Sequence, residues 1–203
     1  MTGADGRLIA LTELLRQARA VPVIRVADAG RALAVLAQVA DAGLPVAELT
    51  ATTPGWADAL TEARTRWPGL VTGVGTVVTA ADARQAARLG AGFLVSPYPA
   101  APVREVADST GVPFIEGGFT PAEIAAAASR GIAKLFPAHV GGPSYLRSLL
   151  SVLPGAAIIP TGGIQPGQAG EWLAAGALAV GLGRALLTGD VSTTMAALSG
   201  FSQ

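Results

Sequence analysis

Short runs of apolar residues alternate along the chain with longer segments rich in alanine and leucine, and eight such pairs follow an amphipathic first segment. The apolar runs lack a clean alternation of polar and apolar positions, which is typical of parallel strands buried on both faces. The predicted strands are 21–26 (VPVIRV), 46–50 (VAELT), 70–73 (LVTG), 93–96 (FLVS), 114–116 (FIE), 132–136 (IAKLF), 157–160 (AIIP) and 178–181 (LAVG).

Each apolar run is followed by a segment with helical spacing and recognisable helix boundaries. Thr79 and Thr120 precede two of these segments as N-cap residues, and Pro121 takes a first helical position. Glycine follows several others, as at Gly43 and Gly90, which is a usual helix stop. The predicted helices are 30–42, 56–67, 80–89, 101–109, 121–129, 143–153 and 166–175, and a last one covers Arg184–Leu187 and continues onward.

Eight strand–helix units of about 20–25 residues predict an α/β protein with the (β/α)8 (TIM) barrel fold. We expect a single domain over residues 1–203, with an extra N-terminal helix in MTGADGRLIALTELLRQARA. An open doubly wound sheet is the alternative, because it uses the same alternation. The count of eight favours the barrel, as does the lack of a GxGxxG or Walker loop after the first strand.

The composition of the chain limits the classes of partner and chemistry that can be expected. The chain is 51% hydrophobic and 14% charged with zero net charge, so neither nucleic acid nor an anionic membrane is an expected partner. No apolar run reaches the roughly 18 residues of a membrane-spanning helix. The absence of cysteine excludes disulfides, zinc–thiolate sites and cysteine nucleophiles. With an acidic, helical start in place of a signal peptide, a cytoplasmic location is expected.

The barrel prediction locates the functional end, because catalytic groups stand at the C-terminal ends of the strands and in the loops that follow them. We call this end the mouth. The residues predicted there are Arg25, Glu48, Thr50, Thr52, Thr53, Thr76, Ser96, Pro97, Glu116, Lys134, Phe136, Thr161 and Arg184.

Lys134 is the most informative of these residues. Of the 14 lysine and arginine residues it is the single lysine, and it stands in the apolar strand GIAKLFPA. An amine that loses hydration favours its neutral, nucleophilic form. Such an amine can attack a ketone to form a Schiff base, an electron sink for cleavage of the adjacent carbon–carbon bond. The structural alternative is a lysine whose ammonium reaches the barrel end or pairs with a carboxylate.

Glu48 is the second candidate, because an acid inside the apolar run VAELT needs a cationic partner or a proton to transfer. Schiff-base chemistry requires several proton transfers, and one carboxylate beside the lysine can serve them. The alternative is a buried ion pair between Glu48 and Arg25.

The loops PTGGIQP and VGLGRAL follow the last two predicted strands. Backbone N–H groups of Gly162, Gly163 and Gly183, with the start of the next helix, can cradle a phosphate. The alternative is that these glycines only form tight turns. The only histidine, His139, is expected in a loop, no spacing suggests a metal site, and Ser96 has no base for a triad.

In this order, the segments VAELTATTP, GVGTV, FLVSP, GGFTPAE, AKLFPA, GGPSYLRSL, PTGGI and AVGLG resemble the 2-keto-3-deoxy-6-phosphogluconate aldolases and the related 4-hydroxy-2-oxoglutarate and phosphogalactonate aldolases. The resemblance extends from VPVIRV to GLGRALL. It implies a homotrimeric class I aldolase without cofactor or metal, acting on pyruvate and a phosphorylated aldehyde.

The same resemblance implies roles for particular residues. Lys134 resembles the Schiff-base lysine and Glu48 the general acid/base. Thr76 resembles a threonine that contacts the pyruvate carboxylate, and Arg25 an arginine that reaches into the site. Gly162 and Gly163 resemble phosphate-loop glycines.

Three positions depart from the family pattern. Thr52 stands where some members have a carboxylate-binding arginine, Arg184 stands where many have serine, and Glu116 replaces a proline. Arg184 could clamp a phosphate, and Glu116 could repel an anionic substrate or pair with Arg184 or Arg25. Two alternatives to an aldolase remain: a phosphate-binding barrel with isomerase or decarboxylase chemistry, and a non-catalytic trimeric binding protein.

Overall fold

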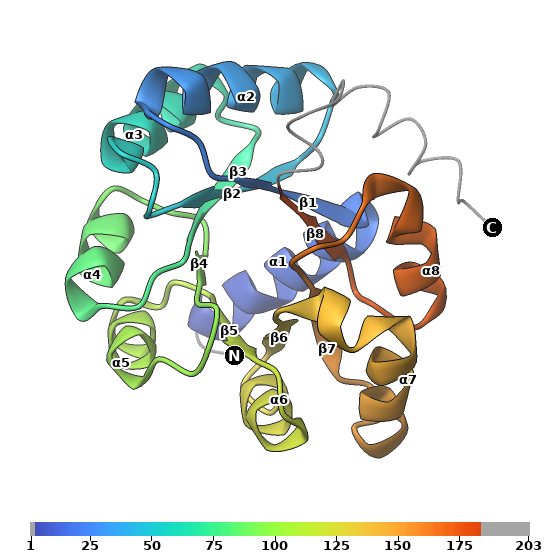
Figure 1. Cartoon of the computed structure of the whole chain (residues 1–203). Coiled ribbons are helices and arrows are strands. Elements are labelled where there is room, and N and C mark those ends of the chain that lie inside the picture. Colours follow the sequence, from blue (N-terminus) through green and yellow to red (C-terminus); the bar gives the residue numbers. More distant parts are fainter. Residues whose placement is uncertain (1–2, 184–203) are drawn as a thin grey trace.

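The computed structural model describes residues 3–183, which fold as a ring of strands surrounded by helices (Figure 1). The strands are β1 Ala20–Ile24, β2 Val46–Thr50, β3 Val71–Gly75, β4 Leu94–Val95, β5 Phe114–Gly118, β6 Ile132–Leu135, β7 Ala157–Pro160 and β8 Val180–Leu182. The helices are α1 Gly3–Ala18, α2 Ala29–Asp41, α3 Trp56–Arg66, α4 Ala80–Arg88, α5 Ala101–Thr110, α6 Pro121–Ala128, α7 Gly142–Val152 and α8 Ala169–Ala174, with short 3-10 turns at η1 Ala138–Val140 and η2 Pro166–Gln168.

The strands form one parallel sheet that closes on itself. Its order is β7-β6-β5-β4-β3-β2-β1-β8. The two outer strands meet through a parallel bridge between Thr161 and Gly181. The Leu178 N–H also donates to the Ile158 carbonyl at 2.9 Å. The ring confirms the predicted (β/α)8 barrel and excludes the open doubly wound sheet, which leaves its edge strands unpaired.

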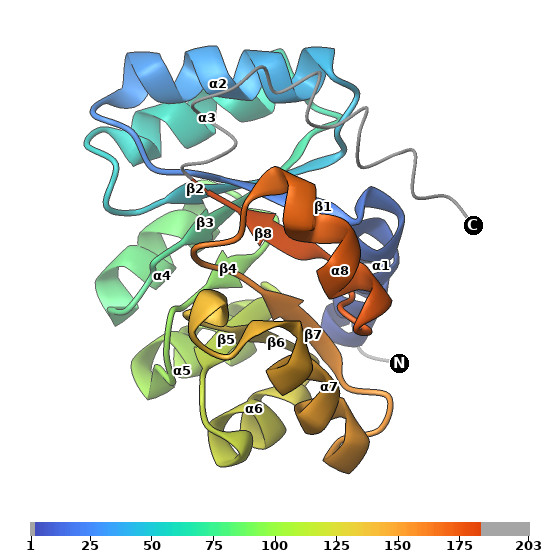
Figure 2. The same cartoon turned by 45° about the vertical axis from the view of Figure 1, so that its right-hand side comes forward.

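Two apolar clusters hold the barrel together. The larger one lies between the sheet and the outer helices and includes Ile24, Leu49 and Val74. The smaller one fills the inside of the barrel, where Leu11 and Leu15 of α1 pack against strand residues such as Phe93. The helix α1 crosses one end of the strands while α2 to α8 flank them from outside (Figure 2). This closes the N-terminal end of the barrel and leaves the mouth open.

Some predicted strand boundaries are wrong by one or two residues. The strands β3 and β5 continue through glycines to Gly75 and Gly118, because neighbouring strands supply partners there: Gly75 pairs with Thr50 and Gly118 with Leu135. The strand β6 ends at Leu135, one residue before the predicted end at Phe136. The predicted helix beginning at Arg184 lies outside the described residues. No helix among residues 3–183 is long and apolar enough to cross a membrane.

The expectation that Glu116 faces the mouth is wrong. Alternation along β5 turns its side chain to the outer face of the sheet, where the carboxylate is 5% exposed. It accepts hydrogen bonds from the Ala100 N–H at 3.0 Å and from Arg104 at 3.1 Å, and it pairs with Arg130 at 3.5 Å. Glu116 therefore ties α5 and the end of α6 to the sheet.

We predict that Glu116→Ala lowers the free energy of unfolding by about 3–5 kcal/mol, because it leaves Arg104 without its buried partner. The matched control is Glu62→Ala, which removes an exposed pair with Arg66 on α3. That loss is expected to be below about 1 kcal/mol. Urea denaturation measures both, and equal losses would contradict the structural role of Glu116.

Candidate active site

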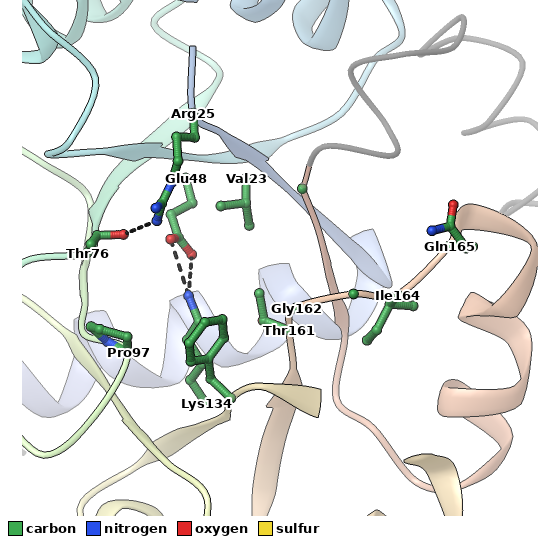
Figure 3. A pocket seen from close by; sticks show the side chains of 13 residues that line it. Val23, Arg25, Glu48, Thr76, Pro97, Lys134, Thr161, Gly162, Ile164 and Gln165 are labelled. Carbon is green, nitrogen blue, oxygen red and sulfur yellow. Dashed lines mark hydrogen bonds and ion pairs between the residues drawn. The ribbon is translucent and has the colours of Figure 1, made fainter. Parts of the chain in front are cut away.

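A cavity of about 610 Å³ opens at the mouth of the barrel. Residues from the ends of β1, β2, β3, β6, β7 and β8, and from the loops after these strands and after β4, contribute to its wall, and Figure 3 shows them around one central space. The lining residues are Val23, Arg25, Glu48, Thr76, Pro97, Lys134, Phe136, Thr161, Gly162, Gly163, Ile164, Gln165 and Gly183. The cavity has the volume of a typical small-molecule site.

Lys134 and Glu48 form an ion pair at the floor of this cavity. The Lys134 Nζ lies 3.3 Å from Oε1 and 3.4 Å from Oε2 of Glu48. The two side chains are 6% and 5% exposed. Because the pair is nearly dry, each charge depends on the other for the stabilisation that water would otherwise give. The predicted partner of Glu48 is therefore Lys134, and the alternative pair with Arg25 is not formed.

Glycines stand beside both functional groups in the adjacent strands, and one glycine of β3, Gly75, makes room for the Glu48 carboxylate. Strand pairing sets Gly73 beside Glu48 and Gly117 beside Lys134. At Gly75, a Cβ atom would overlap the Glu48 side chain itself. A side chain at Gly75 would therefore move the carboxylate away from the lysine.

Below the pair, the barrel interior is nearly filled. The remaining void measures about 10 Å³ and is lined by apolar side chains such as Phe93, Val95 and Ile115, together with the undersides of Glu48 and Lys134. A space of this size accepts about one water molecule. Substrate must therefore reach the lysine through the mouth.

Arg25 and Thr76 form a second polar contact on one side of the cavity. The Arg25 guanidinium donates to the Thr76 hydroxyl at 2.8 Å. Thr76 has φ +57°, a left-handed conformation that a β-branched residue rarely adopts. Such strain is concentrated at functional sites, where the surrounding structure imposes it. The pair presents a cation and a hydroxyl to the cavity, which is a suitable arrangement for an anion.

The glycine loop after β7 forms the opposite wall. Gly162 and Gly163 have φ +99° and +74°, so both take conformations that favour glycine. They also lie against the β6–α7 loop: a Cβ at Gly162 would touch the Phe136 ring, and one at Gly163 would overlap His139. Glycine is therefore needed at these two positions for the tight turn and for close packing against the β6–α7 loop, in agreement with the alternative that these glycines form tight turns.

Not every predicted contact residue reaches the cavity. Thr52 and Thr53 do not line it: Thr53 is fully buried, and its hydroxyl pairs with that of Thr50 at 3.1 Å and accepts from the Val26 N–H. Both hydroxyls bond to that of Thr50 and stabilise the turn after β2, outside the cavity. Arg184 lies outside the described residues. Thr50 and Ser96, also predicted at the mouth, are buried and do not line the cavity. The other predicted residues line it: Arg25, Glu48, Thr76, Pro97, Lys134, Phe136, Thr161, Gly162, Gly163 and Gly183.

Three residues that line the cavity are not predicted from the sequence: Val23, Ile164 and Gln165. Val23 lies on β1, two positions before Arg25, which directly follows the strand, so the period of a strand could have found it. Ile164 and Gln165 directly follow the predicted glycine pair, and only the path of the loop turns them toward the cavity.

Fold and site together define a class of protein: a barrel enzyme whose mouth holds a buried amine beside a carboxylate, the groups that carbonyl chemistry through a Schiff base requires. The model of the KDPG and KHG aldolase family matches residues 11–196. The chain belongs to this family and is an aldolase, an aldehyde-lyase.

Relatives agree with this assignment. The chain is 34% identical over 157 residues to a 2-dehydro-3-deoxy-phosphogluconate aldolase of Haemophilus influenzae, covering 76% of this chain and 74% of the relative. It is 31% identical over 170 residues to the enzyme of that name from Treponema pallidum, covering 82% and 81%.

Among solved structures, a KDPG aldolase from Legionella pneumophila superposes with a TM-score of 0.80 at 25% identity, covering 92% of this chain and 95% of that one. That structure captured pyruvate as a covalent carbinolamine intermediate. A carbinolamine is the adduct that precedes a Schiff base, so the relative uses an amine on a keto acid.

We predict that Gly75→Ala slows aldol turnover about 100-fold, because the new methyl group displaces the Glu48 carboxylate by roughly an ångström. Gly69→Ala is the control, since a Cβ there meets nothing within 4 Å. Steady-state kinetics on both folded variants checks this. Unchanged turnover in Gly75→Ala would show that the position of Glu48 is not critical.

Proposed function

We propose that the chain cleaves or forms a 2-keto-4-hydroxy acid, 2-keto-3-deoxy-6-phosphogluconate or a close relative, with pyruvate and an aldehyde as the smaller partners. Lys134 is the Schiff-base lysine and Glu48 the general acid/base. The observation that carries this proposal is the buried contact of 3.3 Å between Lys134 Nζ and the Glu48 carboxylate at the floor of the mouth cavity.

The contact explains how the lysine becomes a nucleophile. In the resting pair, the carboxylate can accept a proton from the ammonium across the hydrogen bond, which leaves a neutral amine under the substrate. The Nζ atom attacks the keto carbon, C2, to give a carbinolamine. The protonated Glu48 then returns its proton to the departing hydroxyl, so water leaves and the iminium forms.

The same carboxylate serves the carbon–carbon step. Ionised again, Glu48 accepts the proton of the C4 hydroxyl while the C3–C4 bond breaks. The bonding electrons move into the iminium, which becomes the enamine of pyruvate, and the C4 fragment leaves as the aldehyde. Protonation of C3 and addition of water to C2 release pyruvate and restore the amine. Synthesis follows these steps in reverse.

The two polar walls suggest how the substrate lies. Arg25 and Thr76 lie on one side of Lys134 and the loop of Gly162 and Gly163 on the other (Figure 3). A 2-keto acid bound through Lys134 would direct its carboxylate to Arg25 and Thr76. Its distal phosphate would then face the glycine loops, where backbone N–H groups and Gly183 offer neutral donors.

The assembly and location of the protein belong to this proposal as well. The homotrimer rests on the family resemblance, and the cytoplasmic location rests on the lack of cysteine in the sequence. Both stay predictions. A phosphorylated aldehyde as second substrate is supported by the names of the relatives, which act on phosphorylated sugar acids.

We predict that incubation with pyruvate and sodium borohydride leaves a reduced pyruvyl adduct on Lys134, found by peptide mass spectrometry. The chain has a single lysine, so only the amino terminus competes for the label. Lys134→Ala should lose both the adduct and turnover. An unlabelled, folded wild-type protein would contradict the Schiff base and favour the isomerase, decarboxylase or binding alternatives.

We predict that Glu48→Gln still forms the pyruvyl adduct, slowly, but loses turnover by about 10²–10⁴-fold, because the amide can hydrogen-bond to the lysine and cannot transfer a proton. Glu116→Gln is the matched control, since Glu116 is equally buried on the outer face of the sheet. Single-turnover cleavage rates compare the two variants. Equal effects would show that burial, and not proton transfer, explains the loss.

A further inference from the structure

A second cavity, of about 620 Å³, lies at the opposite end of the barrel from the mouth. The turn between α4 and β4 and the turn between α5 and β5 form its walls, and Arg7 of α1 completes it. In Figure 1 the amino end of α1 extends toward α5 behind the strands. The cavity is as large as the one that holds Lys134, yet the chemistry of the aldolase does not use it.

Three arginines line this cavity, and no acidic residue does. They are Arg7 from α1 and Arg84 and Arg88 from α4. Arg84 and Arg88 are four positions apart, so they stand on one face of the helix. Among the described residues, these three side chains have no hydrogen bond or ion pair, whereas Arg66, Arg104 and Arg130 each pair with a carboxylate.

A fourth arginine adds to the positive charge. Arg64 donates to the Leu89 carbonyl at 2.7 Å, and its guanidinium lies against Gly90, one of the lining residues. The chain as a whole has zero net charge, so this concentration of cations is local. Like charges that line one cavity repel one another, and an anion bound among Arg7, Arg84 and Arg88 would offset that repulsion.

The shape of the cavity favours a small ligand. Its floor is buried and apolar, formed by Ala91, Val112 and Pro113, while the arginines are exposed around it. A hollow with an apolar floor and guanidinium groups on its rim suits a compact polyanion, because guanidinium binds phosphate oxygens in pairs. An extended polymer would instead need a charged surface that continues beyond the hollow.

We propose that this cavity, which we call the distal arginine site, binds a small polyanion with two or more phosphate groups. Arg84 and Arg88 hold one anionic group from α4, and Arg7 approaches from α1. The site is separate from the mouth and does not depend on the function proposed for Lys134.

Arginine footprinting of the wild-type chain tests the proposal directly. The protein is treated with phenylglyoxal at low ionic strength, with and without inorganic pyrophosphate, and modified arginines are mapped by peptide mass spectrometry. We expect pyrophosphate to slow modification of Arg7, Arg84 and Arg88 at least about fivefold. Modification of Arg147 on α7, which has no ion-pair partner among residues 3–183, should stay unchanged. Protection of Arg25 would report binding at the mouth separately.

Titration calorimetry with pyrophosphate supplies the second measurement. We expect the double variant Arg84→Ala, Arg88→Ala to lose affinity at the distal arginine site by about 100-fold, and Arg147→Ala to bind as the wild type does. The proposal is wrong if Arg84 and Arg88 are not protected, or if Arg147 is protected equally. It is also wrong if a short single-stranded oligonucleotide protects the three arginines better than pyrophosphate does at the same concentration.

Discussion

The arrangement of the mouth depends on one ion pair, between Lys134 and Glu48, held almost out of water. Neither group is stable alone in this position, because the cost of removing a charge from water exceeds what apolar neighbours return. Together they neutralise each other at 3.3 Å and still allow a proton to pass between them. Gly75 in β3 follows from this constraint, since a Cβ there would overlap the Glu48 side chain and move its carboxylate away from the lysine.

The two ends of the barrel differ because α1 closes only one of them. Leu11 and Leu15 of α1 reach the inside of the barrel from the N-terminal end of the strands, where they extend the apolar cluster around Phe93. This leaves room for about one water molecule under the pair and directs all exchange of substrate and product through the mouth. At the closed end, Arg7, Arg84 and Arg88 line a second cavity, to which no acidic residue of the described range 3–183 contributes.

Glu48 and Glu116 show how strand alternation assigns different roles to the same residue type. Both are acids in short apolar strands, and both are about equally buried. Glu48 faces the inside of the barrel and meets a lysine at the mouth. Glu116 faces outward and forms ion pairs with Arg104 and Arg130, which hold the outer helices to the sheet. The surroundings of each carboxylate, and not its burial, separate a proton-transfer group from a structural ion pair.

The sequence by itself determined the number and order of the elements, since hydrophobic period, caps and helix-ending glycines are local properties of the chain. It also singled out Lys134 and Glu48, because a charged residue in an apolar strand is conspicuous wherever the strand lies. The tertiary structure alone decided that these two meet, that Glu116 faces away, that Thr52 and Thr53 stay outside the cavity and that Gln165 enters it. Those facts depend on register and loop path, which are set by contacts between residues far apart in the chain.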